Sequence, residues 1–319
     1  MKNRIYSVIT CLIFSYNLCA QLHQDEIGIQ SDNDAYLAQG SDRYYTNGIF
    51  IYYNHSLNHK QTYKSLANNV LSFDFGQKLF TSETAFVTSR RQIDRPFAAY
   101  LYIGSALNLL YQNESNIKIG VQLGVVGPAA QGEVLQKYIH KTLSFYPIRG
   151  WQYQIENDIE LNFSGEYNKL LARGAWADIS INSYANIGNG FTGIGIGTLL
   201  RFGNFNQLFN SISTQSTAIK AVKILPLHSK EIFFYYKPQI NLIVYDATIQ
   251  GSLFKPKPAN SLQITLDPKR LSLSQQFGLA YTSNRLIINL AAIFCTKNVK
   301  QMYASTHQWG TITFFYRFN

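Results

Sequence analysis

Apolar and polar residues alternate with a period of two over much of this chain, and this alternation restricts the fold more than any other feature. Between residues 117 and 126 the sequence reads IKIGVQLGVV, which places Ile117, Ile119 and Val121 on one face and Lys118 and Gln122 on the other. Because successive side chains of a strand point to opposite faces, the pattern predicts strands that separate an apolar environment from a polar one.

Residues 155–164 show what the polar face requires. Here Ile159 and Leu161 oppose the acids Glu156, Asp158 and Glu160. A face with three carboxylates cannot contact lipid, so it must line an interior where water, Lys or Arg satisfies the charges.

Twelve segments follow this pattern. They lie near residues 26–34, 46–56, 70–80, 97–111, 116–126, 152–166, 170–185, 190–203, 231–246, 270–283, 285–297 and 309–318. Tight turns near 114, 186–190 and 283–284 contrast with long polar loops at 204–230 and 247–269, and short turns at one end with long loops at the other are typical of outer-membrane barrels. A soluble all-β protein would show the same alternation, but several of these strands exceed the usual five to six residues. The sequence therefore predicts an all-β fold, a twelve-stranded antiparallel transmembrane β-barrel in one domain.

The N-terminus and the composition agree with an exported barrel. Lys2 and Arg4 precede a short apolar run that ends at Ala20, which predicts a signal peptide over residues 1–20 and a barrel domain over 21–319. Its removal lowers the formal net charge from +10 to +8 and leaves Cys295 as the single cysteine, so no internal disulfide is expected. Charged residues make up 14% of the chain, against about 25% in ordinary soluble proteins. No later stretch has the roughly 20 apolar residues of a membrane helix.

One segment, GPAAQGEVLQKYIHKTL at 127–143, breaks the alternation. Pro128 suits a first helical turn, which predicts a short helix at about 128–143 inserted between two strands. An apolar stripe is expected to be buried; it consists of Val134, Leu135, Tyr138, Ile139 and Thr142. Glu133, Gln136 and His140 would share another face, since positions three, four and seven apart lie together. This grouping distinguishes His140 from the other five histidines.

A polar stretch, SDNDAYLAQGSDRYYTNG at 31–48, follows the first predicted strand. By residue chemistry alone it is interpreted either as an outer loop with Asx turns or as a site, and Asp42 and Arg43 as a surface ion pair. Strict alternation would put Asn33 and Asp34 on opposite faces. Both can serve one site only if the strand ends or bulges there.

Four motifs occur in an order that resembles the lipid A 3'-O-deacylase family. They are NDAY followed by DRYYTNG, then DRPFAAYLY at 94–102, LGVVGPAAQGEVLQKYIH at 123–140 and GWQYQIEN at 150–157. The resemblance extends over essentially the whole mature chain, although the C-terminal half matches mainly in strand pattern. It implies a twelve-stranded outer-membrane barrel that removes acyl chains from the 3'-position of lipid A and depends on calcium.

The resemblance also implies site residues. The family's catalytic Asn–Asp pair falls on Asn33 and Asp34, its Thr on Thr46, and its helix Gln and His on Gln136 and His140. Asn33 and Asp34 are then the expected calcium ligands, and His140 the expected base. The family's Lys before DRPFA has no counterpart between Phe80 and Arg95. The nearby cations are Arg90 and Arg91, which are expected to bind substrate.

These observations lead to two hypotheses. The first is an outer-membrane lipid A deacylase of a Gram-negative cell, a carboxylic ester hydrolase that cleaves a 3'-linked acyl or acyloxyacyl ester. The second is a non-catalytic barrel: a pore, a structural protein or an inactive family member. The expected partners are lipopolysaccharide and outer-membrane lipids, whose phosphates suit the positive charge, and the protein is expected to be a monomer. Export and the lack of a nucleic-acid-binding motif argue against a nucleic acid partner.

Overall fold

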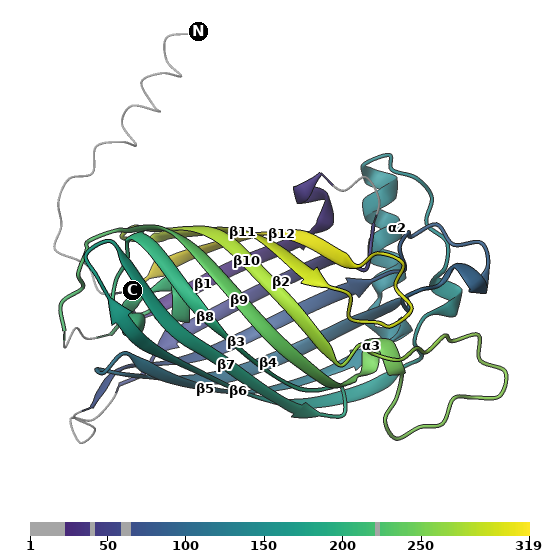
Figure 1. The fold of residues 1–319 in the computed structure, drawn as a ribbon, viewed down its shortest axis with the longest axis horizontal. Helices are drawn as coiled ribbons and strands as arrows, with labels where there is room; N and C mark the ends of the chain where they lie inside the picture. The colour runs from purple at the N-terminus through teal and green to yellow at the C-terminus, as the bar shows by residue number, and fades with distance from the viewer. Residues whose placement is uncertain (1–22, 39–41, 59–64, 221–223) are drawn as a thin grey trace, which may run out of the picture.

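The computed structural model describes residues 23–38, 42–58, 65–220 and 224–319, so the predicted signal peptide lies outside the described residues. The strands are β1 Asp25–Asn33, β2 Tyr45–Ser56, β3 Leu66–Phe80, β4 Ala98–Tyr111, β5 Ser115–Val126, β6 Asp158–Arg173, β7 Ala177–Gly188, β8 Phe191–Asn204, β9 Glu231–Asp246, β10 Leu271–Thr282, β11 Leu286–Thr296 and β12 Thr306–Phe318. Each pairs antiparallel with its neighbours in the chain, and β1 pairs with β12 to close the barrel (Figure 1). The predicted twelve-stranded barrel is confirmed.

The sixth and seventh strands begin later than predicted. Residues 152–166 were expected to form a strand, but β6 begins at Asp158, and Glu156 precedes it. The strand does not begin earlier because Trp151 and Ile155, which precede it, are each buried in an apolar cluster. The strand then continues past the expected turn to Arg173, with a bulge between Leu170 and Ala172.

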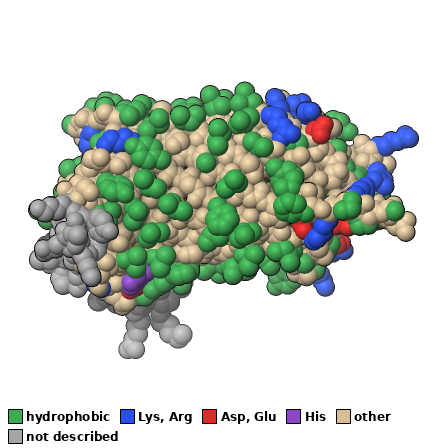
Figure 2. Space-filling view, turned by 90° about the horizontal axis from the view of Figure 1, so that it is seen from below, with side chains coloured by type: hydrophobic (Ala, Val, Ile, Leu, Met, Phe, Trp, Pro, Cys, Tyr) green, Lys and Arg blue, Asp and Glu red, His purple; other side chains and the backbone are tan. Residues whose placement is uncertain are grey.

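The outer wall is apolar, as the alternation predicts. Strand register aligns a continuous row of exposed side chains: Ile29, Ile51, Phe75, Ile103, Leu123 and Leu161. Figure 2 shows hydrophobic side chains spread along the barrel wall, with Lys and Arg gathered towards its ends. Among the described residues, none of the helices is long and apolar enough to cross a membrane.

The long connection 205–230 lies at the other end from the one that the loop lengths suggested. Because strands alternate in direction, the connections after even-numbered strands share the end where β1 begins and β12 finishes. This end also carries the short turns near 114 and 284, whereas the tight turn at 189–190 lies with the long loops. The expectation that loop length alone sorts the two ends is therefore wrong for 204–230 and for 186–190.

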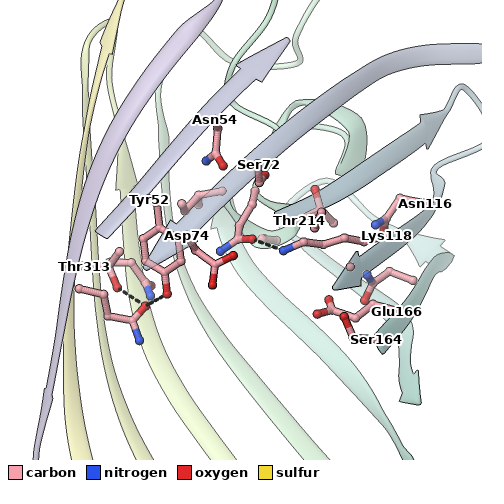
Figure 3. A pocket seen from close by; sticks show the side chains of 18 of the residues that line it. Tyr52, Asn54, Ser72, Asp74, Asn116, Lys118, Ser164, Glu166, Thr214 and Thr313 are labelled. Atoms are coloured by element: carbon pink, nitrogen blue, oxygen red, sulfur yellow. Dashed lines mark hydrogen bonds between the residues drawn. The ribbon is translucent and has the colours of Figure 1, made fainter. Parts of the chain in front are cut away.

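The described part of this connection folds into the barrel and closes it. Asn108 and Asn68 of the inner wall donate hydrogen bonds to the carbonyls of Thr214 and Ala218, and Lys118 donates to Gln215 at 2.7 Å. Arg201 and Glu231 anchor the same segment through Ser211 (3.0 and 2.7 Å). Above it lies a polar cavity of about 380 Å³ (Figure 3), lined by side chains that include Asp74, Lys118, Glu166 and Thr214. We refer to residues 205–220 as the plug.

We expect the barrel to be non-conducting because the plug crosses its lumen. Purified protein in a planar bilayer should show no ohmic current, and a variant with residues 207–219 replaced by a short Gly–Ser turn should conduct. Heat-shifted gel mobility would establish that both forms are folded, since a closed barrel resists detergent until boiled. Steady open-channel current from the unmodified protein would contradict this prediction.

Candidate active site

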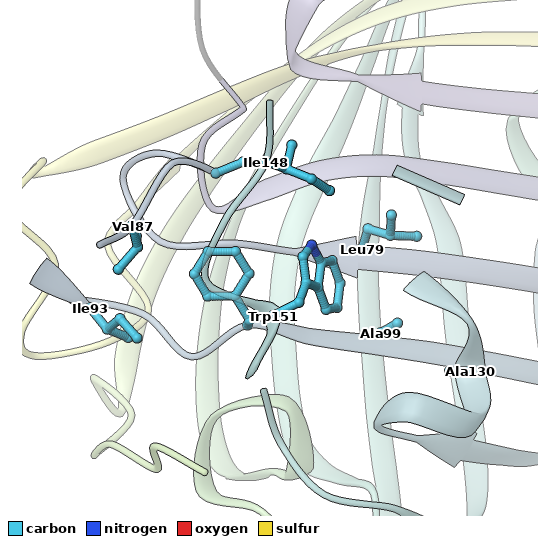
Figure 4. Close-up of a cluster of buried hydrophobic side chains, with 9 residues drawn as sticks. Leu79, Val87, Ile93, Ala99, Ala130, Ile148 and Trp151 are labelled. Atoms are coloured by element: carbon cyan, nitrogen blue, oxygen red, sulfur yellow. The ribbon is translucent and has the colours of Figure 1, made fainter. Parts of the chain in front are cut away.

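The predicted helix lies on the outside of the barrel wall. It consists of a 3₁₀ turn, η3 Pro128–Ala130, and α2 Gly132–Thr142. Leu79 and Ala99 share the outer faces of β3 and β4 with the exposed Phe75 and Ile103, and both pack with Ala130 and Trp151 in a buried cluster (Figure 4). Gly132 is needed at the contact, because a Cβ there would lie 2.4 Å from that of Ala99. The helix is therefore fixed against the wall at the end of the barrel that carries the long loops.

The orientation of α2 differs from the expected one. Gln136 and His140 face the wall and are 0% and 5% exposed, whereas Val134 and Tyr138 are 61% and 67% exposed. The expectation that the apolar stripe is buried is therefore wrong for Val134, Tyr138 and Thr142, whereas Leu135 and Ile139 are half-buried. Hydrogen bonds to the two polar side chains, rather than apolar contacts, determine which face lies inward.

A chain of hydrogen bonds connects the inward face of α2 to the polar stretch after β1. Trp151 Nε1 donates to Gln136 Oε1 (2.7 Å), and Gln136 Nε2 donates to Asp42 Oδ2 (2.6 Å). His140 Nε2 lies 2.6 Å from the same Asp42 oxygen, and Nδ1 lies 2.7 Å from the carbonyl of Tyr146. Because a carbonyl can only accept, Nδ1 carries a proton, and the 2.6 Å contact between Nε2 and the Asp42 carboxylate oxygen requires a second proton between those two atoms.

The other predicted residues lie where β1 ends and β2 begins. Asn33 is the last residue of β1; its Oδ1 accepts from Ala35 N (2.7 Å) and its Nδ2 donates to Asn47 (2.6 Å). The strand thus ends between Asn33 and Asp34, which removes the conflict of opposite faces. Thr46, fully buried, is the extra residue of a bulge in β2, and its hydroxyl accepts from Asn47 at 3.2 Å.

Asp34 lies close to the Asp42–His140 pair. Its Oδ2 accepts from the backbone N–H of Arg43 (2.8 Å), and the backbone N–H of Asp42 donates to the Tyr146 hydroxyl (3.0 Å). Burial raises the pKa of Asp34 to about 8, against a smaller lowering by the Arg43 N–H, and the nearby Asp42 charge raises it further. The structure therefore places Asp34 near the cluster of Asp42, Gln136 and His140, and it links Asn33 and Thr46 to each other through Asn47 where β1 ends and β2 begins.

The oxygen atoms available at this site are of the types that bind a hard cation such as calcium. Calcium prefers carboxylate, amide, hydroxyl and carbonyl oxygens, and Asp34, Asp42, Asn33 and Thr46 supply the first three. Among the residues that the structure describes, no group of three or more His, Cys, Asp and Glu side chains gathers around a metal position. A calcium ion here would accordingly depend on amide, hydroxyl and backbone oxygens together with Asp34.

Arg90 and Arg91 lie in a separate exposed turn, η2 Arg90–Gln92. The guanidinium carbon of Arg90 lies 5.8 Å from the ring centre of Tyr153, and the carbonyl of Arg91 accepts from the Tyr303 hydroxyl at 3.4 Å. Neither contact reaches His140 or Asp34. Both side chains face solvent, where an anionic headgroup is accessible to them.

Sequence patterns alone do not identify Asp42, Tyr146 and Trp151 as site residues. They suggest that Asp42 is a surface partner of Arg43, but it binds Gln136 and His140, and the Arg43 guanidinium lies 4.0 Å from Glu83 instead. The contact between Asp42 and His140 joins residues 98 positions apart, so no local spacing reveals it. The sequence feature that could have indicated Asp42 is the concentration of acidic residues in 31–48.

The Trp151 N–H is expected to position Gln136. Trp151→Phe keeps an aromatic ring in the buried cluster but leaves Gln136 Oε1 without its donor, so the amide can turn away from Asp42. Loss of one such hydrogen bond, about 0.5–1.5 kcal/mol, should lower kcat about 3- to 10-fold with little change in KM. Trp309→Phe, a Trp in β12 that stacks on His307, is the matched control. An unchanged kcat for Trp151→Phe would show that the contact is only structural.

The fold and the site define a class of protein: an outer-membrane β-barrel with a His–Asp–Gln cluster between its outer wall and a loop helix. Residues 7–318 match the family described as "Outer membrane protein LpxR", so the chain belongs to the LpxR family. The resemblance to the lipid A 3'-O-deacylase family inferred from the motifs is thereby confirmed. Its place in the outer membrane follows from the same family and fold.

One solved structure shows the same fold over nearly the whole chain. LpxR from Salmonella typhimurium is 19% identical, with a TM-score of 0.72 over 92% of this chain and 100% of that one. The β domain of the Bordetella autotransporter BrkA (8% identity, TM-score 0.45, 93% and 99% covered) and the KdgM porin (6%, 0.41, 92% and 99%) are similar at a lower level. The comparison with curated proteins gave no match.

Proposed function

We propose that this protein hydrolyses the 3'-linked acyl or acyloxyacyl ester of lipid A in the outer membrane, with His140 as the general base. The observation that carries the proposal is the buried cluster of His140, Asp42 and Gln136 on the outer face of the wall. A site in this position lies on the outer side of the wall and not in the barrel lumen. Membership in the LpxR family supports the same substrate.

The hydrogen bonds of His140 indicate how the ring would act. Its Nδ1–H stays on the Tyr146 carbonyl, which orients the imidazole and stabilises the imidazolium that forms when Nε2 takes a proton from water. In the structure Asp42 lies at Nε2 and shares a proton with it, so Asp42 must move away with that proton before the attacking water can take its place at Nε2. Gln136, itself held by Trp151, donates to Asp42 and keeps this carboxylate close to the ring.

Calcium is part of the proposal. Asp34 would hold the ion together with Asn33, and a bound divalent cation would stabilise the negative charge that develops on the ester oxygen. Thr46, next to Asn47 and Asn33, would orient a ligand or water. Arg90 and Arg91 would contact the phosphates of lipopolysaccharide.

The alternative of a pore has less support. The plug crosses the lumen. The polar cavity above the plug is lined by residues that take no part in the proposed outer site. A pore also has no need for a histidine buried under a helix outside its wall. We therefore retain the hydrolase as the proposed function.

Mass spectrometry of lipid A tests the proposed function directly. Cells that express the chain should contain lipid A lighter by one hydroxyacyl or acyloxyacyl group than cells without it, and cells that express His140→Gln should not. Insertion of each barrel would be checked by heat-shifted mobility. Identical lipid A with and without the inserted protein would contradict the proposal.

A further inference from the structure

The surface of α2 divides into four rows, because residues four apart lie above one another on a helix. One row faces the wall and contains Gly132, Gln136 and His140. The next row is charged: Glu133, Lys137 and Lys141, with a 2.6 Å ion pair between the first two. The remaining two rows are mainly apolar: Val134, Tyr138 and Thr142, then Leu135, Ile139 and Leu143. Apart from the row that faces the wall, the helix thus has a charged flank on one side and an apolar flank on the other.

The apolar flank is not covered by protein. Val134 and Tyr138 are more than half exposed, and so are Leu143 and Phe145 immediately after the helix. A cluster of this size at the surface marks a contact with lipid or with another apolar surface. The residues around the flank indicate whether it contacts lipid or another protein surface.

The flank continues the apolar wall of the barrel. Gly132 contacts Ala99. The next outward residue of β4, Leu101, pairs with Val125, and both pack, as Leu135 does, against the buried cluster that contains Ala99. The outward pair that follows, Ile103 and Leu123, belongs to the exposed apolar row of the wall. One two-residue step along a strand is about 7 Å, so the helix begins within about two steps of the lipid-covered surface.

The charged row fits the same location. Lys137 and Lys141 are exposed on the flank adjacent to the wall-facing row. Helices that carry apolar residues on one side and lysines on the other lie in the interface plane of a membrane, with the cations near anionic headgroups. A lipid leaflet offers hydrocarbon to the apolar flank and phosphate to the lysines, so it is complementary to both flanks at once, unlike a hydrophobic protein surface.

We propose that α2 is an interfacial helix: its apolar flank is inserted into the hydrocarbon edge of the outer leaflet, and Lys137 and Lys141 lie among the lipid phosphates. The occupant of the exposed apolar surface is lipid rather than a protein partner. A consequence, which rests on the proposed function, is that His140 is held at the depth of the ester bonds that join acyl chains to headgroups. The helix would then set the depth of the site as well as cover it.

Spin labels on adjacent residues of the helix test the proposal without reference to activity. Starting from Cys295→Ser, single labels would be placed by Tyr138→Cys and by Lys137→Cys, with Ile159→Cys on the wall as a lipid-facing standard. In vesicles containing lipopolysaccharide, the label at 138 should collide with oxygen as the label at 159 does, and the label at 137 should collide with a water-soluble nickel complex. Equal water accessibility at 137 and 138 would overturn the proposal. Protection of 138 from both reagents, which a protein partner would produce, would overturn it as well.

An activity comparison then tests the consequence. Tyr138→Gln should lower hydrolysis of lipid A in bilayers about 3- to 10-fold, since membrane binding scales with the apolar area inserted. Hydrolysis of detergent-dispersed lipid A should be unaffected, and Lys137→Gln should have a smaller effect in bilayers. If the protein hydrolyses no lipid A, the proposed function fails while the label positions still decide where α2 lies. If both substrates are affected equally, the helix does not set the depth of the site.

Discussion

His140→Gln is expected to lower lipid A deacylation by at least about 10²-fold, the usual scale for general acid–base catalysis. Gln keeps size and polarity but cannot accept a proton near neutral pH. The barrel should survive the change because His140 lies in a loop helix outside the wall and not in a strand. The measurement is the rate of acyl release in membranes, read by mass, with barrel insertion checked by heat-shifted mobility.

His228→Gln is the matched control, since His228 lies in the β8–β9 connection at the other end of the barrel. It should leave the rate unchanged. Asp42→Asn should cost about as much as His140→Gln, and the double variant little more than either alone, because residues that act as a unit are not additive. A His140→Gln enzyme that works at the unmodified rate would show that the histidine only packs the helix.

Removal of divalent cations is expected to abolish activity, and calcium to restore it. The proposed ligand Asp34 is buried beside Asp42, and a bound cation would offset the repulsion between these two carboxylates. Asp34→Asn should therefore raise the calcium concentration needed for half-maximal activity by at least about 10-fold, as expected when a ligand charge is lost. Acyl release would be followed in EGTA and then in a calcium titration.

Asp267→Asn provides the control for charge, because this exposed loop carboxylate lies at the same end of the barrel, 3.4 Å from Lys300. It should not alter the calcium requirement. Full activity in excess EGTA after dialysis would remove the metal from the mechanism while leaving the His140 prediction intact. The two predictions thus fail independently.

Several features of the fold can be predicted from the amino-acid sequence because they depend on local chemistry. The alternation near 117–126 and 159–163 determines which side chains face lipid, and it indicates twelve strands and a closed barrel. The break in that alternation at Pro128 indicates the helix between β5 and β6. The Asp- and Asn-rich end of β1 indicates that the strand stops there, which brings Asn33 and Asp34 together.

Other features depend on contacts between distant parts of the chain. Loop length suggests that 204–230 belongs with the long loops, but the order of the strands places it at the opposite end, where buried Arg201 and Glu231 draw it into the lumen. The start of β6 differs from the expected one because loop packing buries Trp151 and Ile155, which periodicity alone cannot distinguish from a strand.

The sequence by itself determined the barrel and the helix, and its resemblance to the lipid A 3'-O-deacylase family proposed the site residues Asn33, Asp34, Thr46, Gln136 and His140. Only the tertiary structure decided how α2 is turned and that Asp42 is the partner of His140. The reason is physical. A helix with both an apolar and a polar stripe can bury either one, and the choice depends on what faces it. Here the loops beside the wall present Asp42 and Trp151 to the polar stripe, and the surrounding lipid, as we propose, contacts the apolar one.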